Sequence, residues 1–133
     1  MSRKTVVLAI SMAILALTQA HAQTTIQFAE RTWFVRTGNG PPGPNHWSDS
    51  PQNVWVDGNG ALHLKIRYSG GTWYCSEVSS QNTTRYGMHR FYADCRLDSL
   101  DRNVVVGLFL YANDTTEVDM EFAKWGSLYT YNS

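Results

Sequence analysis

The sequence predicts an all-β protein, folded as a β-sandwich or a β-barrel. Apolar and polar residues alternate with a period of two in several short stretches. This pattern is typical of strands, because successive side chains of a strand point to opposite faces of a sheet. Turn-forming residues separate the stretches at intervals of roughly 8–12 positions. No segment after residue 22 shows helical periodicity.

Taken in order, the expected strands cover residues 23–36 (one strand or two), 53–56, 61–68, 73–80, 86–97, 104–111 and 117–122. On the strand 61–68, alternation places Leu62, Leu64 and Ile66 toward the core. Gly38 to Asn45 is rich in glycine and proline, and we expect a stiff loop without a regular element there. This loop either only connects two strands or forms a rim that presents Asn45 and Trp47.

Residues 1–22 have the pattern of a signal peptide. A short basic stretch precedes an apolar run from Thr5 to Leu17, and Ala20-His21-Ala22 fits a cleavage site. The run is shorter than the approximately 20 residues that span a membrane. We therefore expect one exported domain over 23–133, secreted or periplasmic and without a membrane partner. As a complete domain it is expected to be a monomer.

The formal net charge is zero, which argues against nucleic acid as a partner. The aromatic share of 13% suits a β-rich or sugar-binding protein. An oxidising compartment would permit a disulfide between Cys75 and Cys95. The sequence equally allows two small buried thiols.

The segment Glu117-Val118-Asp119-Met120-Glu121-Phe122 alternates acidic and apolar residues strictly. As a strand it places three carboxylates on one face, where like charges repel, so the pattern suggests a use. Residues i and i+4 of a strand lie about 13 Å apart at Cα, and two leaning Glu side chains can approach to roughly 5–6 Å. That spacing fits the nucleophile and the general acid/base of a retaining glycosidase.

The acidic segment resembles the signature of glycoside hydrolase family 16, the laminarinase, lichenase, agarase and carrageenase group. Further similar stretches follow in the family's order: Trp33-Phe34-Val35-Arg36, Gly40 to Trp47, Trp73 to Val78, and Gly107 to Tyr111. The resemblance implies a β-jelly roll of the concanavalin A type, with two antiparallel sheets and a curved cleft for a polysaccharide. It also implies endo-acting hydrolysis of a β-linked polysaccharide, for which a neutral β-1,3- or β-1,3-1,4-glucan is our first choice.

By position in that signature, Glu117 resembles the nucleophile, Glu121 the acid/base, and Asp119 the carboxylate between them. The residues at positions where family members contact sugar are Asn45, Glu77, Tyr111 and Trp125. Alternation places Phe109 beside Tyr111 on the cleft side, and Trp125 shares the carboxylate face if the strand continues beyond Ala123. Plain core packing is the alternative role for each of these aromatic side chains.

Two positions depart from the family pattern. Lichenases often carry an Arg two residues after the equivalent of Glu77, where this chain has Ser79. Some relatives have a Cys after the equivalent of Asn45 that pairs with the equivalent of Cys75, where this chain has His46. Both departures weaken a specific lichenase assignment.

The acidic segment comes late in this chain, whereas the family's motif lies near the middle of the domain. We therefore expect residues 23–133 to correspond to the N-terminal part of such a domain, with a jelly roll incomplete at its C-terminus. Val118, Met120 and Phe122 should then be unusually exposed, and hydrolysis by this chain alone should be weak or absent.

Other classes of function fit part of the pattern. Alternating carboxylates can bind Ca²⁺ through oxygen atoms, so a structural calcium ion is an open alternative to a protein without a cofactor. A non-catalytic, lectin-like β-sandwich would use similar aromatic residues and no acid/base pair. We see no His/Cys cluster for zinc in the sequence.

Overall fold

The computed structural model of the 133-residue chain describes residues 22–113 and 115–127. All but the last residue of the expected signal peptide, 1–22, lies outside the described residues. The described part is all-β, with several small sheets and no α-helix, which agrees with a β-sandwich. None of its helices is long and apolar enough to cross a membrane. The chain forms two compact units that divide after Thr84.

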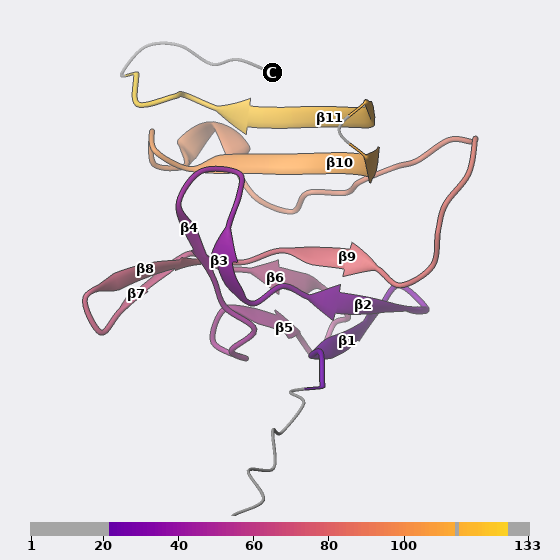
Figure 1. Cartoon of the computed structure of the whole chain (residues 1–133), viewed down its shortest axis with the longest axis horizontal. Coiled ribbons are helices and arrows are strands. Elements are labelled where there is room, and N and C mark those ends of the chain that lie inside the picture. The colour runs from indigo at the N-terminus through magenta and orange to yellow at the C-terminus, as the bar shows by residue number, and fades with distance from the viewer. Residues whose placement is uncertain (1–21, 114, 128–133) are drawn as a thin grey trace, which may run out of the picture. The chain divides into compact units, whose positions relative to one another are not determined.

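The first unit contains nine short strands in three sheets (Figure 1). One antiparallel sheet has the order β1-β2-β9, with bounds Thr25–Phe28, Arg31–Val35 and Val78–Ser80. A second has the order β3-β4-β8-β7, with bounds Gly38–Gly40, Asn45–Trp47, Thr72–Cys75 and Arg67–Ser69. In it only the pairing of β4 with β8 is parallel. The third pairs β5 (Val54–Val56) with β6 (Leu62–Leu64).

Two expected strands are divided at corners, where the chain passes from one sheet to another. The stretch 61–68 becomes β6 and the start of β7, and 73–80 becomes β8 and β9. Lys65 N–H donates to Asn53 O over 2.8 Å, which continues the β5–β6 register by one residue, and the break comes between Lys65 and Arg67. Because of this break, the expected inward face is wrong at Leu64 and Ile66, which are exposed.

The expectation of an irregular loop over Gly38 to Asn45 is also wrong. This stretch forms the β3–β4 hairpin, in which Gly38 pairs with Trp47 and Gly40 with Asn45. Gly38 has a φ of +93°, a backbone conformation that glycine adopts without a Cβ clash. The turn residues between the strands are 41–44, so the proline-rich part itself is irregular, as expected.

Asn53 is fully buried at the centre of the first unit, next to the buried Val54. Its Nδ2 donates to Lys65 O over 3.0 Å and to Tyr74 O over 3.5 Å. Its Oδ1 accepts from Arg67 Nε over 3.4 Å. Buried polar atoms of this kind need hydrogen-bond partners. Here the partners connect the start of β5 with Lys65, with Arg67 at the start of β7, and with Tyr74 on β8.

The second unit is built on the antiparallel hairpin of β10 (Val105–Asn113) and β11 (Thr116–Ala123), which confirms the strands expected at 104–111 and 117–122. The strand expected over 86–97 is wrong. Residues 81–96 form no strand, and they are exposed throughout. Without a paired neighbour their backbone groups gain nothing from extension, so alternation alone does not make a strand there. A short 3-10 helix, η1 (Leu97–Ser99), follows.

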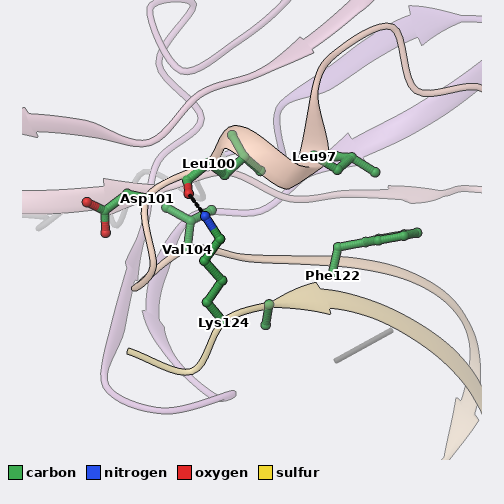
Figure 2. Close-up of a pocket in the computed structure, with 7 residues that line it drawn as sticks. Leu97, Leu100, Asp101, Val104, Phe122 and Lys124 are labelled. Carbon is green, nitrogen blue, oxygen red and sulfur yellow. Dashed lines mark hydrogen bonds between the residues drawn. The ribbon is translucent and has the colours of Figure 1, made fainter. Parts of the chain in front are cut away.

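The loop around η1 packs against the end of β11 (Figure 2). Leu97, Leu100, Val104 and Phe122 line a small hollow there, together with the buried Ala123. Lys124 Nζ donates to Leu100 O over 3.2 Å and closes one side. The hollow has no enclosed space for a water molecule. It is therefore packing between side chains of the second unit and offers no room for a ligand.

Candidate functional site

The register of the β10–β11 hairpin gives each of its faces a distinct chemistry. Glu117 pairs with Tyr111, Asp119 with Phe109, and Glu121 with Gly107. Because residues paired across two strands point to the same face, the three carboxylates share a face with the two aromatic rings. The structure thus brings five sequence-predicted site residues together on one surface.

The carboxylates on this face differ in their surroundings. Glu117 and Asp119 are exposed, whereas Glu121 is half-buried. A Cβ on Gly107 would lie 3.8 Å from Asp119 Oδ1, so this carboxylate is directed along the strand toward the Glu121 end. No described residue forms a hydrogen bond or an ion pair with these three carboxylates. Asp119 and Glu117 therefore form no hydrogen bond with each other in this structure.

The opposite face of the hairpin is apolar. Val106, Leu108 and Leu110 of β10 pair with Phe122, Met120 and Val118 of β11. Val118 is 65% exposed and Met120 48%, which confirms the expected exposure of these two side chains. The same expectation is wrong for Phe122, which is half-buried because it packs into the hollow beside η1.

Trp125 does not extend the carboxylate face as a strand residue. β11 ends at Ala123, and Trp125 lies in a turn with a φ of +49°. The strand alternation that would place Trp125 on the face of Glu121 therefore ends two residues before Trp125. Its side chain is exposed.

Asn45 and Glu77 belong to a second group of polar residues, in the first unit. Glu77 Oε2 accepts from Arg36 Nη1 over 2.6 Å, at the corner where β9 begins. Asn45 Nδ2 donates to Pro42 O within the β3–β4 turn, and its Oδ1 lies 3.6 Å from Cys75 Sγ. Both side chains are half-buried, so each retains an accessible edge.

Arg36 is the member of this group that the sequence did not single out. Besides Glu77, it donates from Nη2 to Pro41 O over 2.6 Å, and its guanidinium lies 4.4 Å from the centroid of the Trp47 ring. Trp47 Nε1 in turn donates to Gly40 O over 3.2 Å. One cation thus connects β2, the β3–β4 hairpin and the start of β9. Arg36 and Glu77 are 41 positions apart, so local alternation carried no signal for this pair.

Cys75 and Cys95 are both thiols in this structure. Burial raises the pKa of the Cys75 thiol, which makes it a weaker nucleophile near neutral pH. Cys95 is exposed on the stretch that precedes η1. Among the described residues, no three His, Cys, Asp or Glu side chains are grouped to hold a metal ion.

The acidic hairpin lies in the second unit, and Asn45, Glu77 and Arg36 lie in the first. That the two groups face one substrate stays a prediction. Comparison of the chain with protein families, with curated proteins and with solved structures finds no match.

Proposed function

We propose that this chain carries the catalytic strand and part of the substrate-binding surface of an endo-acting, retaining glycoside hydrolase. The proposed fold is the β-jelly roll of glycoside hydrolase family 16, and the proposed substrate is a neutral β-1,3- or β-1,3-1,4-glucan. The observation that carries the proposal is the register of β10 and β11, which places Glu117, Asp119 and Glu121 on one face with Tyr111 and Phe109.

In this proposal Glu117 attacks the anomeric carbon, and the bond from that carbon to the leaving oxygen breaks. Glu121 donates its proton to the leaving oxygen, and a covalent glycosyl ester on Glu117 results. Water, deprotonated by Glu121, then attacks the same carbon and releases Glu117. Two inversions give net retention of the anomeric configuration.

Glu121 changes its role between the two steps of this proposal. In the first step it donates a proton to the leaving oxygen, and in the second it accepts one from the attacking water. Asp119 lies between Glu117 and Glu121 on the same face of the strand, close to both groups that carry these roles.

The partners of the carboxylates suit an uncharged sugar. Tyr111 and Phe109 place aromatic rings opposite Glu117 and Asp119, and Gly107 places no side chain opposite Glu121. No basic residue is paired with the acidic strand, and Lys124 donates to Leu100 O instead. A sulfated polysaccharide would require such cations, which is why a neutral glucan is proposed.

In the first unit, Asn45 and Glu77 are proposed to contact the sugar chain. Family lichenases often place an Arg two residues after the equivalent of Glu77. This chain has Ser79 at that position, and Arg36, which directly follows β2, donates to Glu77 instead. The guanidinium holds the carboxylate in one orientation and leaves its second oxygen available to a sugar hydroxyl.

The proposal is tested by measuring how the full chain binds and hydrolyses laminarin and a mixed-linkage β-glucan. Reducing ends should appear with wild-type protein, at a low rate, and NMR should find the β-anomer first. Glu117→Gln should abolish hydrolysis and leave glucan binding intact. Glu30→Gln, which changes an exposed carboxylate in the β1–β2 turn, is the matched control and should behave as wild type.

Each other result points to a different protein. Glucan binding with no trace of hydrolysis by wild type, even at high protein concentration and long incubation, would favour a lectin-like β-sandwich. An inverted product would exclude the covalent intermediate. Activity that a chelator abolishes would favour the calcium-binding interpretation of the carboxylates.

A further inference from the structure

An exposed aromatic pair lies on the β7–β8 hairpin, away from every residue assigned so far. Tyr68 of β7 pairs directly with Trp73 of β8, and their ring centroids are 5.2 Å apart at an interplanar angle of 49°. Tyr68 is 57% exposed and Trp73 62%. The residues beside them, Arg67, Ser69, Thr72 and Tyr74, are half-buried. The hairpin thus turns its two large rings outward and its smaller or polar side chains inward.

The hairpin holds this pair in a fixed arrangement. Ser69 pairs with Thr72, so only Gly70 and Gly71 form the turn, with φ values of +57° and +85°. A two-residue turn with positive φ at both positions matches the twist of the flanking strands and fixes their register. The rings are therefore presented before any ligand arrives, which lowers the entropic cost of binding.

The same face of the sheet leads from this pair to Asn45. Trp47 of β4 pairs with Cys75 of β8, so these residues share a face with Asn45 and Trp73, which lie two positions before them on their strands. The 3.6 Å approach of Cys75 Sγ to Asn45 Oδ1 agrees with that assignment. Adjacent strands lie about 4.8 Å apart, so Asn45 on β4 and Tyr68 on β7 are separated by two strand spacings, or roughly 10 Å. β7 and β8 run side by side next to β4 in Figure 1.

The side chains that these strands contribute to the face are uncharged: Asn45, Trp47, Trp73, Cys75 and Tyr68. The Arg36 guanidinium covers Trp47 and is paired with Glu77, so the charge lies at the Trp47 end, away from Tyr68. A row of exposed rings ending at an amide suits a pyranose chain, whose ring faces are apolar and whose edges carry hydroxyl groups. We propose that Tyr68 and Trp73 bind further sugar units of a neutral polysaccharide that is held at Asn45. The identity of the ligand rests on the proposed function, whereas the surface itself rests only on this sheet.

Binding to laminarin and to its disaccharide, laminaribiose, tests the proposal in the full chain with a Glu117→Gln background, so that no substrate is consumed. Trp73→Ala and Tyr68→Ala should each weaken laminarin binding by roughly three- to tenfold, because each removes one ring contact. Trp73→Phe keeps a ring and should lose less. Laminaribiose has two sugar rings, enough to reach from Asn45 to Trp73 on the neighbouring strand, so its affinity should also fall in Trp73→Ala.

Tyr86→Ala is the matched control, since Tyr86 is fully exposed in the segment 81–96 and should not affect binding. Unchanged laminarin binding in Trp73→Ala would overturn the inference while leaving hydrolysis by the wild type, and so the proposed function, unaffected. Equal losses in Tyr86→Ala, or no glucan binding by the background protein, would also overturn it. Loss of binding in Trp73→Ala together with a wild type that does not hydrolyse glucan would uphold the surface and favour the lectin-like alternative over the enzyme.

Discussion

Glu121 of β11 lies directly opposite Gly107 of β10, so the half-buried carboxylate of the acidic strand faces no side chain across the hairpin. The other two carboxylates face aromatic rings, at Tyr111 and Phe109. An acid/base group needs an open approach for both a leaving oxygen and a water molecule. At Glu121 the facing residue adds no side chain, although Asp119 Oδ1 and Phe109 Cδ1 lie 3.8 Å from the place that a Cβ on Gly107 would take.

Gly107→Leu should therefore reduce glucan hydrolysis on the order of tenfold or more, because the new side chain occupies the space beside Glu121. Gly107→Ala is the matched control. Its Cβ would meet Asp119 Oδ1 and Phe109 Cδ1 at 3.8 Å, which are ordinary contacts. Turnover of the alanine variant should stay within about twofold of wild type. Similar melting temperatures for both variants would exclude misfolding, and equal turnover in Gly107→Leu would contradict the proposed approach.

Arg36→Met should lower the free energy of unfolding by about 1–2 kcal/mol, since it removes the ion pair with Glu77 and the cation over Trp47. Arg31→Met, on the same strand but exposed, should change it by no more than about 0.5 kcal/mol. Urea denaturation measures both. If Glu77 binds sugar in the orientation that Arg36 holds, laminarin affinity should fall in the first variant alone.

Local pattern predicted the acidic strand well, because both of its faces are encoded within the six residues 117–122, and alternation on 104–111 then predicted which rings share the carboxylate face. It failed where distant residues decide the structure. The strand expected over 61–68 is divided because β6 pairs with β5 in one sheet and β7 with β8 in another. Arg36 and Glu77 are 41 positions apart in sequence, so no local pattern indicates their ion pair.

Asn53→Ala should destabilise the protein by about 2–4 kcal/mol. It leaves Lys65 O and Tyr74 O without the amide that donates to them, in a fully buried position. Asn59→Ala, an exposed position in the β5–β6 turn, should change stability by less than about 0.5 kcal/mol. Chemical denaturation followed by tryptophan fluorescence compares them. A loss below about 1 kcal/mol in Asn53→Ala would show that water or a rearranged Arg67 satisfies the freed carbonyl groups.

Asp57 should make the stability of the first unit depend on acid pH. Its carboxylate accepts from His63 Nε2 over 2.9 Å and from the N–H groups of Asn59 and Ala61 over 2.9 and 3.0 Å. The hydrogen bond from His63, followed by those two backbone groups, holds the pKa of Asp57 below its ordinary value of 3.8. The ionised form is therefore favoured by folding. Its contribution is present above about pH 4 and is lost as the pH falls through the lower pKa of the folded state.

The difference in melting temperature between wild type and Asp57→Asn should accordingly shrink as the pH falls from about 4 through the lowered pKa of Asp57. Asp98 and Asp101 also have lowered pKa values, from Arg96 and from the Asn103 N–H respectively, but they are present in both proteins and cancel in the difference. Asp94→Asn, an exposed carboxylate in the segment 81–96, serves as the control and should match wild type at each pH. A difference that does not shrink at all with falling pH would mean that Asp57 acts through the shape of its side chain in the turn and not through its charge.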